Sequence, residues 1–374
     1  MPELPDVVDL LLELAAIPSP PGAEREVADR VTDYLRTLDL DVAEDECGAE
    51  IGSTIGNLHT RLPPRDADGG VPIFFCAHLD TVPPEGPLEP VVEDGVVTNR
   101  APTIVGADNK AAVAVMLEGV RRLVEEGRPH AGVELLFTPR EEVGLEGAKA
   151  FDVDALAAKT GFVYDYEGEI GTIVRSAPYS FAVDAVFRGR SAHAGINPEE
   201  GRSAVYAASR AIADLRLGRV DDETTANIGT ISGGSARNVV PDRCMVVGEA
   251  RSRDERKLGE IVQEMLDSFA FAASLAGCEV DVEVQEKYRG YRLGPEDPAF
   301  RLAGRALHAA GYEPQTIDGG GAADANVFNN RGLSCANLTH GVHSFHSPDE
   351  RVAVADLEAM VGVTLELVEA ARTP

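Results

Sequence analysis

The sequence predicts an α/β fold that is interrupted by a smaller α+β segment. Strand-forming runs at 73–77, 132–138 and 161–164 alternate with a helical pattern at 109–126, which is typical of a largely parallel or mixed sheet. Residues 179–288 follow a different order, β-α-β-β-α-β, which is the ferredoxin-like arrangement. We therefore expect one α/β domain that carries an insertion.

The first part of that domain, residues 1–178, opens with two helical patterns. Apolar residues recur at helical spacing over 6–16 and 23–38, and three prolines separate the two patterns. A polar connector rich in Gly and Pro, at 62–72, precedes the first strand-forming run. Helices followed by buried strands indicate the layered packing of an α/β domain.

The insertion and the last segment, 289–374, each show their own pattern. Within the insertion, strands are expected at 180–188, 225–232, 243–250 and 278–285, with helices at 202–217 and 254–276. The last segment returns to α/β character with helices near 298–310 and 355–372. Because neither terminal segment has enough strands to stand alone, we expect both to form one domain, with the insertion acting as a lid.

The composition limits the classes of protein to which the chain can belong. A chain of 374 residues is long enough for two domains, and 44% hydrophobic and 26% charged residues are ordinary for a globular protein. The net charge of −29 argues against nucleic acid as a partner, because phosphates would be repelled.

The cysteines and the apolar runs bear on the compartment. There are five cysteines, an odd number, and no CxxC pair, which favours a reduced, cytoplasmic protein over a disulfide scaffold. The N-terminal residues are acidic and proline-rich and do not follow the pattern of a secretory leader. We find no apolar stretch of about 18 residues, so no membrane span is expected.

Acidic and histidine side chains follow two of the predicted strands directly. His78-Leu79-Asp80 ends one buried run, and Glu141-Glu142 follows another. Two residues apart on an extended chain, His78 and Asp80 share a face, so Asp80 is placed to brace the imidazole. A satisfied histidine and a solvated turn are the alternatives, but such groups together also suit divalent metal and activated water.

Three further candidates lie elsewhere in the chain. Asp108 opens the helix at 109–126, where an aspartate is also a preferred N-cap. Asp165 ends the strand at 161–164, and His346 is the last of three histidines spaced by three. Strand ends are where open α/β sheets build their sites, which favours a shared centre.

Taken together, these segments resemble the M20 zinc metallopeptidases, most closely the peptidase T-like branch of tripeptide aminopeptidases. The shared segments occur in family order and are 78–82, 106–110, 141–144, 164–165, 189–195, 319–326, and His346 with Glu350. They span nearly the whole chain. The resemblance implies a zinc-exopeptidase-like α/β catalytic domain and an inserted ferredoxin-like lid and dimerisation domain.

The resemblance also implies the chemistry of the site. It predicts two Zn²⁺ per subunit, with Co²⁺ or Mn²⁺ as substitutes. The five expected ligands are His78 and Asp165 for one ion, Glu142 and His346 for the other, and Asp108 as the bridge. Glu141 would be the general base on a water molecule, and Asp80 would orient His78.

Substrate contacts are expected from the insertion. By resemblance, His193 stabilises the oxyanion from the lid of a partner subunit, which makes a homodimer the active unit, and Asn238 and Arg251 contact substrate. The expected substrate is a short peptide whose N-terminal residue is released. A deacylase or carboxypeptidase acting on N-acyl amino acids is the alternative, because it would use the same catalytic residues. The stretch 319–326 differs in detail from the family's usual Gly-Gly-x-Asp-Ala-Asn and leaves the peptide preference open.

Overall fold

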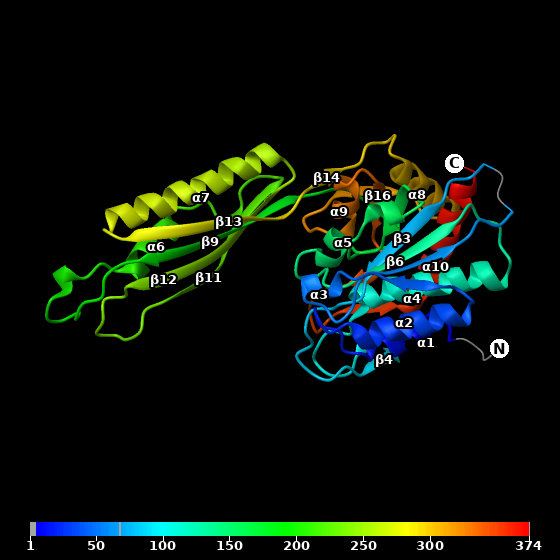
Figure 1. Ribbon diagram of the computed structural model, residues 1–374, viewed down its shortest axis with the longest axis horizontal. Helices are drawn as coiled ribbons and strands as arrows, with labels where there is room; N and C mark the ends of the chain where they lie inside the picture. The colour runs from blue at the N-terminus through cyan, green and yellow to red at the C-terminus, as the bar shows by residue number, and fades with distance from the viewer. Residues whose placement is uncertain (1–4, 67–68, 374) are drawn as a thin grey trace. The chain divides into compact units, whose positions relative to one another are not determined.

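The computed structural model describes residues 5–66 and 69–373, so residues 67–68 of the predicted connector lie outside the described part. The chain forms two compact units (Figure 1). One comprises the residues up to Ser176 together with those from Arg292 onward, and the other is Ala177–Tyr291. The second unit begins and ends within a few residues of the predicted insertion at 179–288.

A large mixed sheet forms the centre of the first unit. Its strand order is β1-β2-β6-β3-β7-β16-β8-β14, with β15 beside β8. The strands are β1 (Val42–Glu44), β2 (Leu58–Leu62), β3 (Ile73–His78), β6 (Val133–Thr138), β7 (Thr160–Val163), β8 (Thr172–Ala177), β14 (Tyr291–Arg292), β15 (Gln315–Asp318) and β16 (Ser334–Leu338). Every residue of β3 and β6 is buried, which explains why both strands are apolar apart from Glu134 of β6 and the terminal residues His78 and Thr138. Strand β3 lies parallel to both β6 and β7, so these three strands end at the same edge.

Helices pack against this sheet and against one another. They are α1 (Val7–Ala15), α2 (Arg25–Thr37), α3 (Gly48–Ile51), α4 (Ala107–Glu125), α5 (Glu146–Ala150), α8 (Pro298–Ala309), α9 (Asp324–Asn330) and α10 (Val354–Arg372), with a 3-10 turn at Val153–Ala155. Helix α4 contacts α1, α10 and β3, and it is buried on almost every side over its first three turns. Among the described residues, none of the helices is both long and apolar enough to cross a membrane.

A small second sheet, β17-β18-β5-β4, completes this unit. Its strands are β4 (Pro90–Glu93), β5 (Val96–Asn99), β17 (Val342–His343) and β18 (Arg351–Ala353). Because β18 pairs with β5, the chain after residue 342 is held beside the segment that leads into α4. This pairing brings the last histidines of the sequence close to the start of α4.

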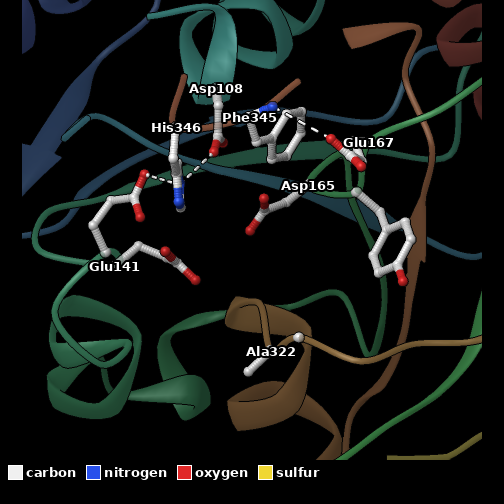
Figure 2. Close-up of a pocket in the computed structure, with 10 residues that line it drawn as sticks. Asp108, Glu141, Asp165, Glu167, Ala322, Phe345 and His346 are labelled. Atoms are coloured by element: carbon white, nitrogen blue, oxygen red, sulfur yellow. Dashed lines mark hydrogen bonds and ion pairs between the residues drawn. The ribbon is translucent and has the colours of Figure 1, made fainter. Parts of the chain in front are cut away.

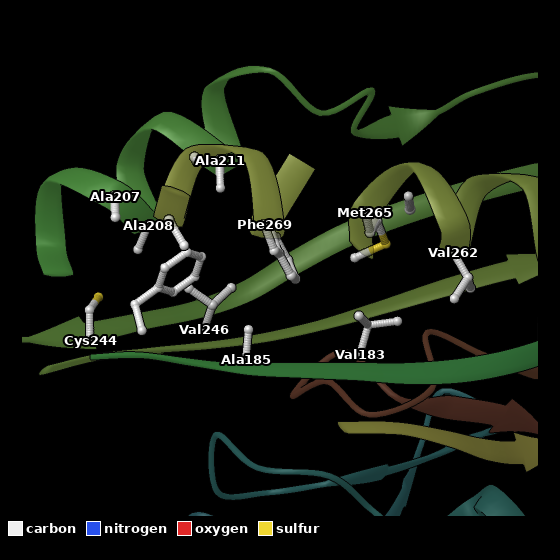
Figure 3. Packing of buried hydrophobic residues seen from close by; sticks show 14 of the residues in the cluster. Val183, Ala185, Ala207, Ala208, Ala211, Cys244, Val246, Val262, Met265 and Phe269 are labelled. Atoms are coloured by element: carbon white, nitrogen blue, oxygen red, sulfur yellow. The ribbon is translucent and has the colours of Figure 1, made fainter. Parts of the chain in front are cut away.

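The inserted unit is one antiparallel sheet with two helices on one face (Figure 3). Its elements are β9 (Tyr179–Arg188), a 3-10 turn (Pro198–Glu200), α6 (Ala204–Ala213), β10 (Gly218–Arg219), β11 (Thr224–Gly233), β12 (Arg243–Ser252), α7 (Glu255–Leu275) and β13 (Glu279–Tyr288). The strand order is β10-β11-β12-β9-β13. Alternate residues of β12 are buried, and Val246 and Phe187 meet Phe269 of α7 in the core. The predicted order β-α-β-β-α-β is present, with the short β10 added.

One buried charge lies within the large sheet, away from the strand ends described below. The carboxylate of Glu134 on β6 accepts hydrogen bonds from Arg61 at 2.7 Å, from the backbone N–H of Ala158 at 2.7 Å, and contacts His59 at 3.1 Å. Burial opposes its ionisation, but these hydrogen bonds outweigh burial and lower the pKa of Glu134 to about 2.

We expect Glu134→Gln to reduce the free energy of unfolding at pH 7 by about 3 kcal/mol, which is the size of the pKa shift converted to energy. Because the folded-state pKa is depressed, this stability is present above the unfolded pKa of 4.5 and is lost as pH falls through about 2. Urea unfolding at pH 7 and pH 3 should therefore show a smaller difference at pH 3. Glu126→Gln, which removes an exposed ion pair with Arg128, is the control and should change stability little. Equal effects of both substitutions would contradict this role.

Candidate metal centre

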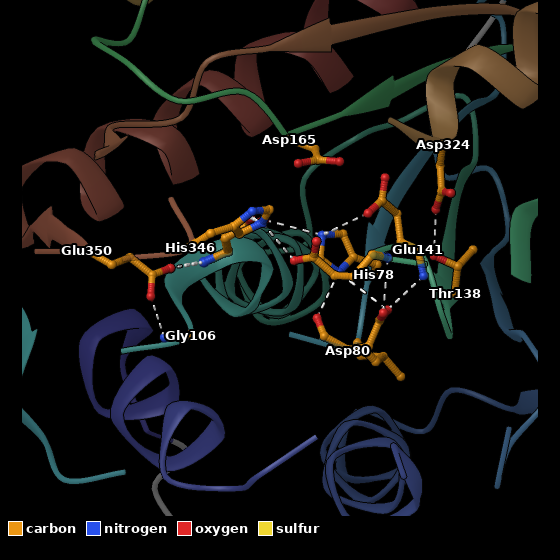
Figure 4. Close-up of polar contacts among 12 residues, drawn as sticks. His78, Asp80, Gly106, Thr138, Glu141, Asp165, Asp324, His346 and Glu350 are labelled. Carbon is orange, nitrogen blue, oxygen red and sulfur yellow. Dashed lines mark hydrogen bonds and ion pairs between the residues drawn. The ribbon is translucent and has the colours of Figure 1, made fainter. Parts of the chain in front are cut away.

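The centre lies at the carboxyl ends of three neighbouring parallel strands (Figure 4). His78 is the last residue of β3, Glu141 and Glu142 follow β6, and Asp165 follows β7. Because parallel strands deliver their ends to one edge of a sheet, side chains separated by many residues in sequence converge there. The convergence is therefore a consequence of strand order.

The imidazole of His78 is held in one orientation. Its Nδ1 lies 2.8 Å from the backbone carbonyl of Asp80, which can only accept, so Nδ1–H donates to that carbonyl. Nε2 lies 3.2 Å from Oδ1 of Asp108, and neither of these two buried atoms has a hydrogen-bond partner among the described residues. His78 thus presents Nε2 toward a carboxylate oxygen of Asp108.

The carboxylate of Asp80 hydrogen-bonds mainly to the backbone of the turn at Glu141 and Glu142. Its Oδ1 accepts the backbone N–H of Glu141 at 2.9 Å, and its Oδ2 accepts that of Glu142 at 3.1 Å. Oδ1 is also 3.5 Å from Nδ1 of His78, farther away than the Asp80 carbonyl. Sequence spacing predicts that Asp80 lies beside His78, and in the structure Asp80 also fixes the turn that carries both glutamates.

Asp108 lies at an irregular entry into α4. Gly106 has φ +78°, and Asp108 has φ −82° and ψ 104°, which are not helical values. The carboxylate of Glu350 accepts the backbone N–H of Gly106 and that of Asp108, each at 2.8 Å. The side chain of Asp108 is thereby free to point away from the helix, and its Oδ2 lies 3.1 Å from Nε2 of His346. The helix-cap alternative does not describe this carboxylate.

His346 is the most exposed of these side chains and joins two carboxylates. Its Nε2 lies 3.1 Å from Asp108 and 3.1 Å from Glu142 (Figure 2). The backbone is left-handed at His346, with φ +60°, and at Arg140, with φ +56°, just before the glutamate turn. Non-glycine residues adopt this conformation at an energetic cost, and such strain concentrates at functional sites.

Two overlapping groups of side chains have the geometry of metal ligands. His78, Asp108 and Asp165 each offer one ligand atom, and these atoms lie within 4.8 Å of one another; Asp108, Glu142 and His346 do the same. Asp108 belongs to both groups. The structure thus brings together all five predicted ligands, with Asp108 in the shared position.

These groups face a cavity of about 210 Å³ (Figure 2). Its lining residues are Asp108, Glu141, Glu142, Asp165, Tyr166, Glu167, Gly321, Ala322, Phe345 and His346. Among these described residues there are five carboxylates and no lysine or arginine, so the cavity attracts cations.

Burial and the charges of neighbouring side chains determine the pKa values of the ionisable groups in this centre. Burial first, and then the charge of Asp165, raises the pKa of Glu141 well above its usual range. Burial also acts to raise the pKa of Asp108, but its contacts with His346 and then His78 outweigh burial, and the pKa is lowered. Contacts with Asp108 and then Glu142 raise the pKa of His346 to about 10. Positive charge between these groups is therefore strongly stabilised.

Divalent cations fit this donor set. Nε2 of His78 and Oδ1 of Asp108 are buried 3.2 Å apart with no hydrogen-bond partner among the described residues, which is costly unless a proton or a metal cation lies close to both. One imidazole and carboxylate oxygens in each group suit zinc, and cobalt or manganese accept the same ligands.

The remaining predicted residues belong to the inserted unit. His193 is exposed, and its loop is joined to that of Asn238 by a hydrogen bond from the N–H of Ala194 to the carbonyl of Asn238. Arg251 pairs with Glu249 at 3.0 Å. Roles for these three residues at the metal centre are proposals.

Sequence reasoning gave no role to two residues that act on the candidate ligands. Glu350 was noted only for its spacing from His346, although it binds the backbone that carries Asp108. Asn337 lies in an apolar strand and hydrogen-bonds the backbone of Asp165. A polar residue in the otherwise apolar run at 335–338 was the available signal.

Comparison with known proteins agrees with this geometry. Residues 74–370 match the family described as peptidase family M20/M25/M40. The uncharacterized protein YqjE of Bacillus subtilis is 36% identical over 365 residues, covering 98% of each chain. Solved structures of aminopeptidase PepT from Bacillus cereus (37% identity, TM-score 0.89) and of a tripeptidase from Staphylococcus aureus (32%, TM-score 0.93) each align over 98% of both chains. The chain belongs to the M20 peptidase family and is a hydrolytic peptidase.

Proposed function

We propose that the protein is a dinuclear zinc aminopeptidase that releases N-terminal residues from short peptides, with tripeptides as the expected substrates. The observation that carries this proposal is the pair of overlapping ligand groups that share Asp108. The similar chains named as an aminopeptidase and a tripeptidase support the substrate class.

In this proposal each of the two ligand groups would hold one cation, and Asp108 would be a ligand shared by both groups. The groups are His78 with Asp165 and Glu142 with His346. When bound, the cations supply a Lewis acid for the scissile carbonyl and lower the pKa of a water molecule. Glu141 takes a proton from the attacking water and delivers it to the leaving amine.

The geometry of Glu141 suits this role. Its backbone is fixed by Asp80, and its Oε2 lies 4.0 Å from Nε2 of His78, beside the ligand groups but in neither of them. Its raised pKa, caused mainly by burial, makes its carboxylate a stronger base than an exposed glutamate. Asp80 contributes by binding the backbone N–H groups of Glu141 and Glu142, which fixes both glutamates beside His78.

For the inserted unit we propose substrate contacts. His193 would donate a hydrogen bond to the oxyanion from a partner subunit, and Asn238 and Arg251 would bind substrate, so that a homodimer is the active form. Mixing inactive Glu141→Gln and His193→Ala proteins tests the sharing, since restored activity requires sites built from two chains. We also propose a cytoplasmic location, which the five free cysteines support.

The experiment that tests the function is a substrate panel. Tripeptides with a free amino terminus, N-acetylated forms of the same tripeptides and N-acyl amino acids should be compared with the zinc-loaded protein. We expect cleavage of the free tripeptides and a loss of at least about 100-fold in kcat/KM on acetylation, equivalent to some 3 kcal/mol of transition-state binding. Cleavage of N-acyl amino acids in preference to free tripeptides would overturn the aminopeptidase proposal and favour the deacylase alternative.

A further inference from the structure

Asn337 lies on β16 at the junction of three strands. Its backbone aligns with Val163 of the parallel β7 on one side and with Val174 of the antiparallel β8 on the other. The register with β7 ends at this pair, one residue before Tyr164 and two before Asp165. Among the described strands, none pairs with the chain beyond this point toward Asp165.

Where the pairing of β16 with β7 ends, the side chain of Asn337 forms hydrogen bonds with the backbone of Asp165. Its Nδ2 donates to the carbonyl of Asp165 at 2.8 Å, and its Oδ1 accepts the N–H of Asp165 at 3.0 Å. Both ends of one amide therefore pair with both backbone groups of one residue, as a neighbouring strand would. The Asn337 side chain is buried, so water does not readily replace these bonds.

The carboxylate of Asp165 depends on this support. Within residues 5–66 and 69–373, no donor reaches the Asp165 carboxylate, and Figure 4 shows it apart from the other connected side chains. Its direction toward His78 and Asp108 is therefore set through its own backbone. Ligands must be held to within a fraction of an ångström for a metal to bind tightly, so the residue that fixes this backbone matters.

We propose that Asn337 is a positioning residue that fixes Asp165 for the cation held with His78. This inference rests on the proposed function, because it assigns Asn337 to one of the two cation positions. Loss of the amide should weaken that position and leave the Glu142 and His346 position nearly unchanged, since no contact of the Asn337 side chain reaches those two residues among the described contacts.

The chain offers a matched control at the other end of the same strand. Nδ2 of Asn329 donates to the carbonyl of Cys335 at 2.7 Å, and Oδ1 of Asn329 accepts the N–H of Cys335 at 3.1 Å. Asn329→Ala thus removes a similar pair of bonds to β16, together with a bond from Nδ2 to the carbonyl of Ala325 at 2.8 Å, without touching Asp165. Both substitutions should lower the melting temperature of the metal-free protein, but only Asn337→Ala should alter cation binding.

The test is titration of metal-free full-length protein with Co²⁺, followed by calorimetry and by visible absorption. For wild type we expect two cations per chain; for Asn337→Ala we expect one of the two to bind about 10- to 100-fold more weakly and the other to be unchanged. In activity assays with saturating Zn²⁺, kcat should fall more than KM rises. Asn329→Ala should bind both cations as wild type does.

A second variant covers the case in which Asn337→Ala does not fold. Asn337→Asp keeps the size and the acceptor for the Asp165 N–H, but it loses the donor to the Asp165 carbonyl. Its added negative charge attracts cations, so weaker Co²⁺ binding at one position would come from lost positioning and would support the proposal.

The contradicting results are distinct. Binding of both cations at wild-type affinity by Asn337→Ala, or by Asn337→Asp where the alanine variant does not fold, would overturn the proposal, as would equal weakening by Asn329→Ala. Failure of the wild-type protein to bind two cations would instead overturn the proposed function, and this inference with it.

Discussion

Glu141→Gln is expected to reduce turnover of a tripeptide by about 10³- to 10⁴-fold while the protein keeps its full metal content. The amide has the size of the carboxylate but cannot accept a proton from water. Glu141 belongs to neither ligand group, and its backbone N–H remains bound to Asp80, so the fold and the cation positions should not change. The measurements are steady-state kinetics and metal analysis of the same preparation.

The neighbouring glutamate provides the control. Glu142→Gln removes a candidate ligand whose Oε1 lies 3.1 Å from His346, so it should lower the metal content as well as the turnover. Metal content therefore distinguishes the role of Glu141 from that of Glu142. Full activity of Glu141→Gln would show that the proton acceptor is another group, and loss of metal from that variant would show that Glu141 is a ligand.

Asp108→Ala is expected to have the largest effect, because Asp108 alone among the described residues belongs to both ligand groups. We expect no detectable turnover and binding of fewer than two cations at any Zn²⁺ concentration that saturates wild type. A cation that binds only the folded state raises the melting temperature, so wild type should be stabilised by added Zn²⁺ and this variant should respond much less.

Asp33→Ala is a suitable control for Asp108→Ala, because Asp33 lies exposed on α2 and its only ion pair is with Arg36 at 3.8 Å among the described contacts. It should keep the wild-type response to Zn²⁺. If Asp108→Ala were stabilised by Zn²⁺ as strongly as wild type, Asp108 would not lie between two cations.

Much of the candidate metal centre is predictable from the sequence, because several of its side chains directly follow the ends of predicted strands. The runs 73–77 and 135–137 are continuous and apolar, so the positions of His78, Glu141 and Glu142 follow from where those runs stop. The alternation of strands and helices then predicts the parallel sheet that gathers these positions at one edge. The order of the elements in the inserted unit was predicted in the same way, from periodicity.

Other features depend on contacts that no local pattern encodes. The carboxylate of Asp80 binds backbone N–H groups 61 and 62 residues away, and that of Glu350 binds backbone more than 240 residues away. Short strands such as β17 and β18 are stabilised by pairing with each other and, for β18, with β5, so their own residues show no clear period. The start of α4 was predicted at 109, but the chain is irregular at Asp108 because Glu350 and His346 hold it there.

We propose that two cations bind side by side and share Asp108 as a ligand. Anomalous X-ray diffraction from crystals of the zinc-loaded protein, recorded at the zinc absorption edge, tests this arrangement most directly. We expect two peaks per chain, one in contact with His78, Asp108 and Asp165 and the other in contact with Asp108, Glu142 and His346. A fully active crystal form with a single peak, or with zinc bound away from Asp108, would contradict it.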